Sequence, residues 1–225
     1  IGRGLEPGRR DIDARGRLVL PGGVDSHCHV EQLSSTGKMC ADDFYSATVA
    51  AAFGGTTTII PFAAQHRGNS IVAVVDDYAR RAAEKAVIDY GFHLLIADPN
   101  ERALNEELPA MIRRGITSFK VYMTYDLLRL ADDQLLDVLA AADRERALVM
   151  VHAENHEIIM HLVARELAAG HTEPRWHPHT RPAAQPSKPT ARTSSPARKP
   201  ATHMTTRDSS AGRACSGYAP PFEPK

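Results

Sequence analysis

Two periodicities of apolar and polar positions alternate along the chain from about residue 16 to residue 170. Short apolar runs rich in β-branched and aromatic residues are typical of strands, and apolar positions every three to four residues are typical of amphipathic helices. The pattern predicts strands at 17–23, 56–62, 89–96, 118–125 and 147–153, and helices at 42–55, 70–85, 132–144 and 155–169, with one more helical stretch that ends near residue 114.

The predicted strands are nearly continuous apolar runs, which is typical of parallel strands that helices bury on both faces. Five successive β/α units favour a partial (β/α)8 barrel of the TIM type over an open doubly wound sheet. The predicted fold class is therefore α/β. In such a barrel the functional side chains gather at the carboxyl ends of the strands.

Composition divides the chain at about residue 182. Residues 1–180 carry 19 Lys and Arg against 25 Asp and Glu, whereas residues 181–225 carry 8 against 2. Residues 183–225 contain no Leu, Ile or Val and are rich in Pro, Ser, Thr, Ala and Arg, so they cannot bury enough apolar surface to offset the entropy of ordering. We predict a partial barrel at 21–182 and a disordered tail at 183–225.

Composition also limits the class of protein. With 43% apolar residues the chain should form a core, and no run is long enough to span a membrane or serve as a secretion signal, so the cytoplasm is expected. Three cysteines without CxxC spacing indicate free thiols. The basic tail could bind nucleic acid, but its only aromatic residues are Tyr218 and Phe222, so a solvated tail without a nucleic-acid partner is expected.

Two histidines, His27 and His29, are separated by one residue near the start of the predicted barrel. In a strand, side chains two positions apart point to the same face, so both imidazoles would point into the barrel. Such a pair can bind one divalent metal ion, with Zn²⁺ as the first candidate. Two polar residues at the mouth of a strand remain the alternative.

Lys120 lies inside the apolar run SFKVYMTY, and His152 ends the run ALVMVHA. A charged ammonium facing a barrel core carries a heavy desolvation cost. Lys120 therefore either extends outward to solvent or has a neutral amine, which can add carbon dioxide to form a carbamate that bridges two metals. Together with His27 and His29, these residues occupy the ends of three predicted strands, which favours a metal site.

The stretches LPGGVDSHCHV, FGGTTTIIPF, AVIDYGFH, SFKVYMTY and VMVHAENHEIIMHL resemble the cyclic amidohydrolases, the family of dihydropyrimidinase and D-hydantoinase within the amidohydrolase superfamily. The resemblance implies two divalent metal ions, with His27 and His29 on one, His152 on the second, and a carboxylated Lys120 between them. It implies that Tyr125 is catalytic and binds the substrate carbonyl and its oxyanion, and that Tyr122 faces the ring substituent.

The implied activity is hydrolysis of a dihydropyrimidine or hydantoin to an N-carbamoyl amino acid, by a protein that forms a homotetramer at full length. The family also requires a histidine and an aspartate from later strands, and no apolar strand follows residue 182. We therefore expect impaired activity, a β-sandwich remnant at 1–20 that enters the barrel, and a reading frame lost near residue 183. Two alternatives stay open: a dihydroorotase-like amidase, which should show an arginine soon after the two histidines, and a non-catalytic dihydropyrimidinase-like assembly protein.

Overall fold

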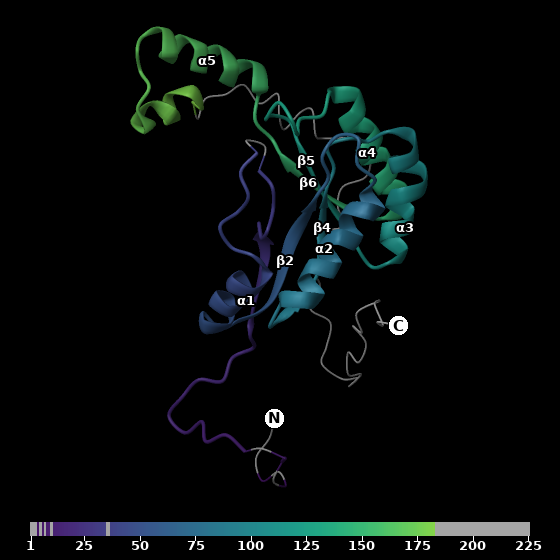
Figure 1. The fold of residues 1–225 in the computed structure, drawn as a ribbon, viewed down its shortest axis with the longest axis vertical. Helices are drawn as coiled ribbons and strands as arrows, with labels where there is room; N and C mark the ends of the chain where they lie inside the picture. The colour runs from purple at the N-terminus through teal and green to yellow at the C-terminus, as the bar shows by residue number, and fades with distance from the viewer. Residues whose placement is uncertain (1–3, 5, 7, 10, 35–36, 183–225) are drawn as a thin grey trace.

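One parallel sheet forms the centre of the molecule (Figure 1). The computed structural model describes residues 4, 6, 8–9, 11–34 and 37–182, so the tail predicted at 183–225 lies outside the described residues. The strand order is β1-β2-β4-β5-β6, with β3 also paired to β2, and every pair is parallel. The strands are β1 (Gly23–Cys28), β2 (Thr56–Ala64), β3 (Asp89–Tyr90), β4 (His93–Leu95), β5 (Ser118–Tyr122) and β6 (Leu148–His152).

Helices cover one side of this sheet. Figure 1 shows α2, α3 and α4 together on that side, whereas α5 projects away from the sheet. The helices are α1 (Phe44–Phe53), α2 (Ile71–Lys85), α3 (Leu108–Arg113), α4 (Asp132–Glu145) and α5 (His156–Ala168), with a π-helical turn η1 (Ala103–Glu107) and a 3-10 segment η2 (Pro174–Thr180). No helix in the described part of the chain is long and apolar enough to cross a membrane.

Side-chain caps begin the helices where the sequence changes from loop to periodic pattern. Asp43 caps α1 by accepting a hydrogen bond from the Ser46 N–H at 2.9 Å. Asn155 caps α5 in the same way by accepting from the Ile158 N–H at 3.1 Å. Each such cap satisfies a helix N–H that would otherwise have no partner and is worth about 1 kcal/mol.

The central strands are buried on both faces, as the apolar runs predict. Phe62 and Phe119 are fully buried in β2 and β5, and Ile71 and Val75 of α2 belong to the same core. Burial of each such side chain stabilises the fold by about 1.5–3 kcal/mol. The half-barrel predicted from the sequence is therefore the observed architecture.

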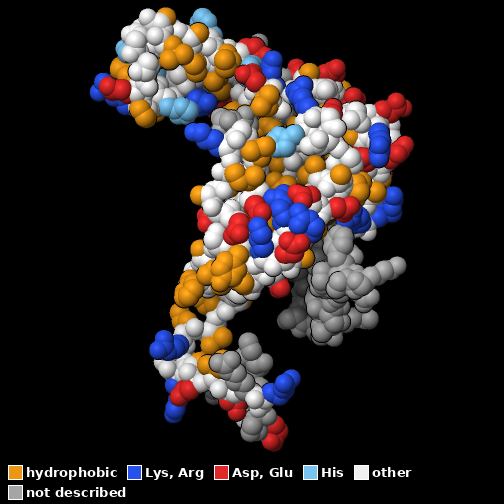
Figure 2. Space-filling view, in the orientation of Figure 1, with side chains coloured by type: hydrophobic (Ala, Val, Ile, Leu, Met, Phe, Trp, Pro, Cys, Tyr) orange, Lys and Arg blue, Asp and Glu red, His pale blue; other side chains and the backbone are white. Residues whose placement is uncertain are grey.

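The first predicted strand is misplaced. The run at 17–23 was expected to be a strand, but β1 begins at Gly23, where pairing with Thr56 of β2 starts. Leu18, Val19 and Leu20 are instead 89%, 73% and 74% exposed. Apolar composition does not by itself supply a neighbouring strand to hydrogen-bond with. Figure 2 shows exposed hydrophobic side chains over α1 and the segment before β1.

The strand predicted at 89–96 is interrupted. β3 and β4 keep one register along β2, but pairing stops opposite Ile60 and Pro61. Proline has no N–H to donate, so a ladder is commonly broken beside it. The strand predicted at 118–125 also ends early, at Tyr122, and Tyr125 adopts a left-handed turn with φ 71°.

Candidate metal centre

Strand pairing places three of the predicted site residues, Lys120, Tyr122 and His152, on one face of the sheet. Residues paired in register share a face, and the register pairs Phe62 with His93 and Tyr122 with His152. Leu95, two residues after His93, pairs with Lys120. These side chains therefore belong to one face, which we call the inner face.

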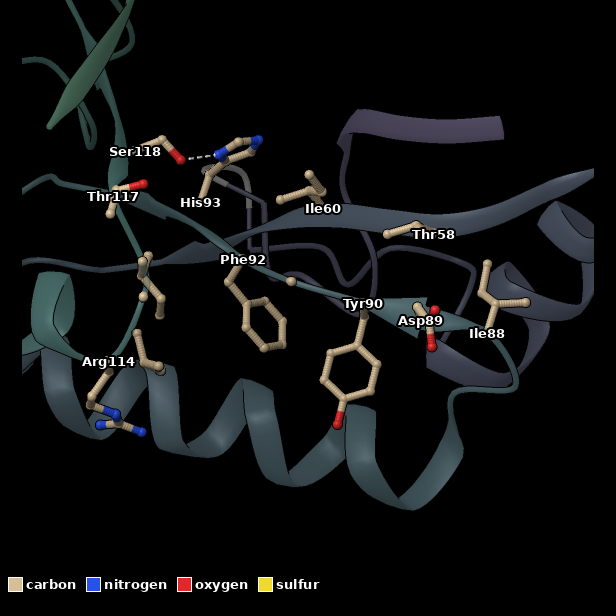
Figure 3. A pocket seen from close by; sticks show the side chains of 14 residues that line it. Thr58, Ile60, Ile88, Asp89, Tyr90, Phe92, His93, Arg114, Thr117 and Ser118 are labelled. Atoms are coloured by element: carbon tan, nitrogen blue, oxygen red, sulfur yellow. Dashed lines mark hydrogen bonds between the residues drawn. The ribbon is translucent and has the colours of Figure 1, made fainter. Parts of the chain in front are cut away.

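The inner face is the one turned away from α2. Phe92 precedes His93 and points to the opposite side, where its ring lies 6.3 Å from the ring of Tyr78 on α2. Figure 3 shows the same division, with Phe92 and Tyr90 directed toward the helix and His93 on the other side of the strand. Tyr90, Phe92 and His93 also line a pocket of about 600 Å³, and Figure 3 shows the side chains around it.

His27 and His29 lie together against Phe62, as the alternation of a strand predicts. Their ring centres are 4.9 Å and 5.1 Å from that of Phe62 and 5.9 Å from one another. Nδ1 of His29 donates to Oε1 of Gln32 at 2.7 Å, which leaves its Nε2 lone pair available to a metal. Burial lowers the pKa of His27, and Lys120, His29 and His93 lower it further. The neutral imidazole, which is the form that binds metals, is therefore favoured.

Lys120 does not extend to solvent. The residue is 7% exposed, and within the described residues no carboxylate pairs with it. Burial lowers the pKa of its amine, and its Nζ lies 5.4 Å from the centre of the Tyr122 ring. Of the two alternatives that the sequence left open, the structure favours an amine with increased neutral character.

His152 lies beside both predicted substrate-binding tyrosines. Its ring centre is 5.4 Å from that of Tyr122 and 5.0 Å from that of Tyr125. Its Nε2 donates to Oε2 of Glu154 at 2.6 Å, and Glu154 also pairs with Arg181 at 3.3 Å. The carboxylate therefore orients the imidazole and leaves Nδ1 free as a possible metal donor.

The predicted ligands form two groups rather than one closed set. His27 and His29 surround Phe62, whereas Lys120 and His152 flank Tyr122. Within the described residues, no three His, Cys, Asp or Glu side chains are close enough to hold a metal. The imidazoles and an amine able to form a carbamate suit Zn²⁺ as donors, so the residues present fit part of a binuclear site.

Sequence reasoning missed three residues that support these groups. His93 contacts both Ser26 and Ser118, Glu154 orients His152, and Glu31 secures the loop after His29. The carboxylate of Glu31 accepts from Lys85 Nζ at 2.8 Å and from the Phe44 N–H at 3.2 Å. These partners lie on α2 and α1, and Figure 2 shows charged side chains gathered over α2.

The fold and its inner-face imidazoles define a β/α-barrel protein of the amidohydrolase class. The family model described as "Amidohydrolase family" matches residues 18–177. The chain belongs to this family, which confirms the resemblance found in the sequence.

Particular relatives can be named within that family. The chain is 48% identical to a D-hydantoinase of Geobacillus stearothermophilus over 185 residues. The aligned region covers 81% of this chain and 39% of the relative. A solved D-hydantoinase structure matches with a TM-score of 0.80 and 44% identity, covering 85% of this chain and 42% of that one. A dihydropyrimidinase structure from Brevibacillus agri matches with a TM-score of 0.68 and 40% identity, covering 76% and 39%. The chain thus spans about two fifths of the length of these relatives.

Proposed function

We propose that this chain provides part of a binuclear metal centre for hydrolysis of a cyclic amide, a hydantoin or a dihydropyrimidine, to an N-carbamoyl amino acid. The observation that carries the proposal is a buried lysine without an acidic partner on the same face as the imidazoles of His27, His29 and His152. Similarity to D-hydantoinases supports the choice of substrate.

Each ligand has a separate part in this proposal. His27 and His29 would hold one divalent ion, with Zn²⁺ as the expected metal, His152 would hold a second, and Lys120 as a carbamate would join the two. When bound, the ions would supply Lewis acidity toward water and the amide carbonyl. Burial lowers the pKa of His27, which favours the form of the imidazole that binds a metal, and Glu154 orients His152.

The two tyrosines would act on the substrate directly. Tyr125 follows β5 in a strained left-handed turn and is 38% exposed, so its hydroxyl can donate to a substrate carbonyl oxygen at the rim. Tyr122 is 8% exposed, and burial raises the pKa of its hydroxyl. It would therefore remain neutral and form a wall against the ring substituent.

The purified chain should bind Zn²⁺ in the presence of bicarbonate and open hydantoin or dihydrouracil rings slowly. Slow turnover is expected because the described strands carry His27, His29, Lys120 and His152 but not the other two ligands that the resemblance implies. Metal analysis of the wild type and of His27→Ala measures zinc binding, and a ring-opening assay measures turnover. Failure of the wild-type chain to bind metal contradicts the proposed centre, and turnover at the rate of a full-length relative contradicts the impairment.

Glu154→Gln should weaken metal binding by about 10- to 100-fold, the usual effect of removing a partner that orients a ligand. The amide retains the size of the carboxylate but cannot hold the Nε2 proton of His152 as strongly. Zinc titration against a competing chelator measures the change. Glu157→Gln is the matched control, because Glu157 is exposed and pairs with Arg129. Equal affinities of the two variants would disprove the orienting role of Glu154.

A further inference from the structure

The part of β1 that carries His27 lacks regular pairing with its neighbour. β1 pairs with β2 at Gly23, Val24, Asp25 and Cys28, and the register shifts between Asp25 and Cys28. Ser26 and His27 therefore have no register partner on β2. Something other than the β1–β2 ladder must fix the position of this segment if His27 is to meet a metal in a defined geometry.

His93 makes a connection of this kind between β1 and the rest of the sheet, in addition to the local hydrogen bond from the His27 N–H to Oδ1 of Asp25. It lies on β4, on the inner face, and its Nε2 is 3.0 Å from the backbone carbonyl oxygen of Ser26. Its Nδ1 is hydrogen-bonded to the hydroxyl of Ser118 on β5 (Figure 3). A carbonyl only accepts, so Nε2 carries the proton and Nδ1 accepts from the Ser118 hydroxyl.

Packing restricts the imidazole to this position. His93 is 9% exposed, and its ring centre lies 5.2 Å from that of Phe62, the same ring that His27 and His29 contact. The buried side chain of His93, on β4, thus connects β5 with β1. To do so it reaches over β2, the strand that lies between β1 and β4.

We propose that His93 is a positioning residue that holds the Ser26 carbonyl and thereby sets the orientation of His27. Its effect on metal binding rests on the proposed function, whereas the fixing of β1 does not. Ser26 immediately precedes His27, so a rotation of the Ser26 peptide would turn the His27 side chain. Ligand geometry depends on supporting contacts of this kind, and their loss typically weakens metal binding about 10- to 100-fold.

Three substitutions separate the hydrogen bond from ring packing. His93→Phe keeps a ring of similar size but removes both hydrogen bonds. His93→Gln keeps a donor near the position of Nε2, whereas His93→Asn has the same amide on a side chain too short to reach Ser26. His156→Phe is the matched control, because His156 is 8% exposed and bonded to Thr124, away from β1.

The first measurement is hydrogen exchange in the metal-free protein over residues 23–30. His93→Phe and His93→Asn should exchange faster there by about 10-fold, whereas His93→Gln and His156→Phe should match the wild type. If His93→Phe does not fold, the comparison of Asn with Gln gives the answer. Unchanged exchange in both the Phe and Asn variants overturns the proposal, as does an equal increase in His156→Phe.

The second measurement is zinc affinity. His93→Phe and His93→Asn should bind about 10- to 100-fold more weakly, with recovery in His93→Gln and no change in His156→Phe. Wild-type affinity in the Phe and Asn variants overturns the effect of His93 on the metal centre. If the wild-type chain binds no zinc, the proposed function fails, while the exchange measurement still decides whether His93 positions β1.

Discussion

Replacing Lys120 with methionine is expected to remove most of the bound metal and to raise the free energy of unfolding of the metal-free chain. The amine is buried on the inner face, and no carboxylate within the described residues neutralises it. Methionine fills a similar volume without a charge. The gain in stability at neutral pH should be roughly 1–3 kcal/mol, the usual penalty of a buried polar group without a partner.

The gain should depend on pH in a defined direction. Burial lowers the pKa of Lys120 below its ordinary value of 10.5, so the unfolded chain binds more protons than the folded chain between the two pKa values. The free energy of unfolding of the wild type therefore rises with pH in that interval. The penalty is complete below the folded pKa and is relieved as the pH approaches 10.5. The advantage of Lys120→Met should accordingly shrink in alkali.

Urea unfolding with a chelator, at neutral and at alkaline pH, measures this difference, and elemental analysis measures the metal. Lys38→Met provides the control, because Lys38 is exposed and its loss should change stability by no more than about 0.5 kcal/mol. A Lys120→Met chain that is less stable at neutral pH would contradict the buried-charge argument. Full retention of metal by the variant would contradict the ligand role.

The sequence predicted the strands well where they are continuous apolar runs. It predicted them poorly where the pairing with a neighbouring strand determines the position at which a strand begins. β5 and β6 lie within the runs that contain Lys120 and His152. The apolar run at 18–20 fails as a strand because the hydrogen-bonding partner of β1 begins only at Thr56, opposite Gly23. Strand pairing depends on the tertiary structure, and the local periodicity of the sequence does not predict it.

The sequence likewise predicted one part of the candidate site and not the rest. Strand alternation was enough to place His27 and His29 around one neighbour, but not to decide whether Lys120 was buried or reached solvent. That answer depends on Leu95 and Met150, which pair with Lys120 on either side. His93 was overlooked because its partner is a backbone carbonyl at Ser26, far away in the sequence, and no residue type marks such an acceptor.

Phe62→Ala is expected to lower the free energy of unfolding by about 3–5 kcal/mol, the typical result of truncating a fully buried phenylalanine. The ring is 0% exposed, so its removal leaves a cavity in addition to the lost burial. Phe53→Ala is the matched control: Phe53 is 91% exposed, and its truncation should change stability by no more than about 0.5 kcal/mol. Urea unfolding of the two variants gives the comparison, and equal midpoints would disprove the central packing role of Phe62.

Loss of this ring should also disturb the proposed metal centre, because His27, His29 and His93 all pack against it. Phe62→Leu distinguishes this effect from unfolding, since leucine fills much of the volume but offers no flat surface to the imidazoles. We expect Phe62→Leu to remain folded in buffer and to bind zinc more weakly than the wild type by about 10-fold. Wild-type zinc affinity in a folded Phe62→Leu chain would show that the proposed ligands His27 and His29 are positioned without the aromatic ring, and that the strand and its loop alone set the geometry.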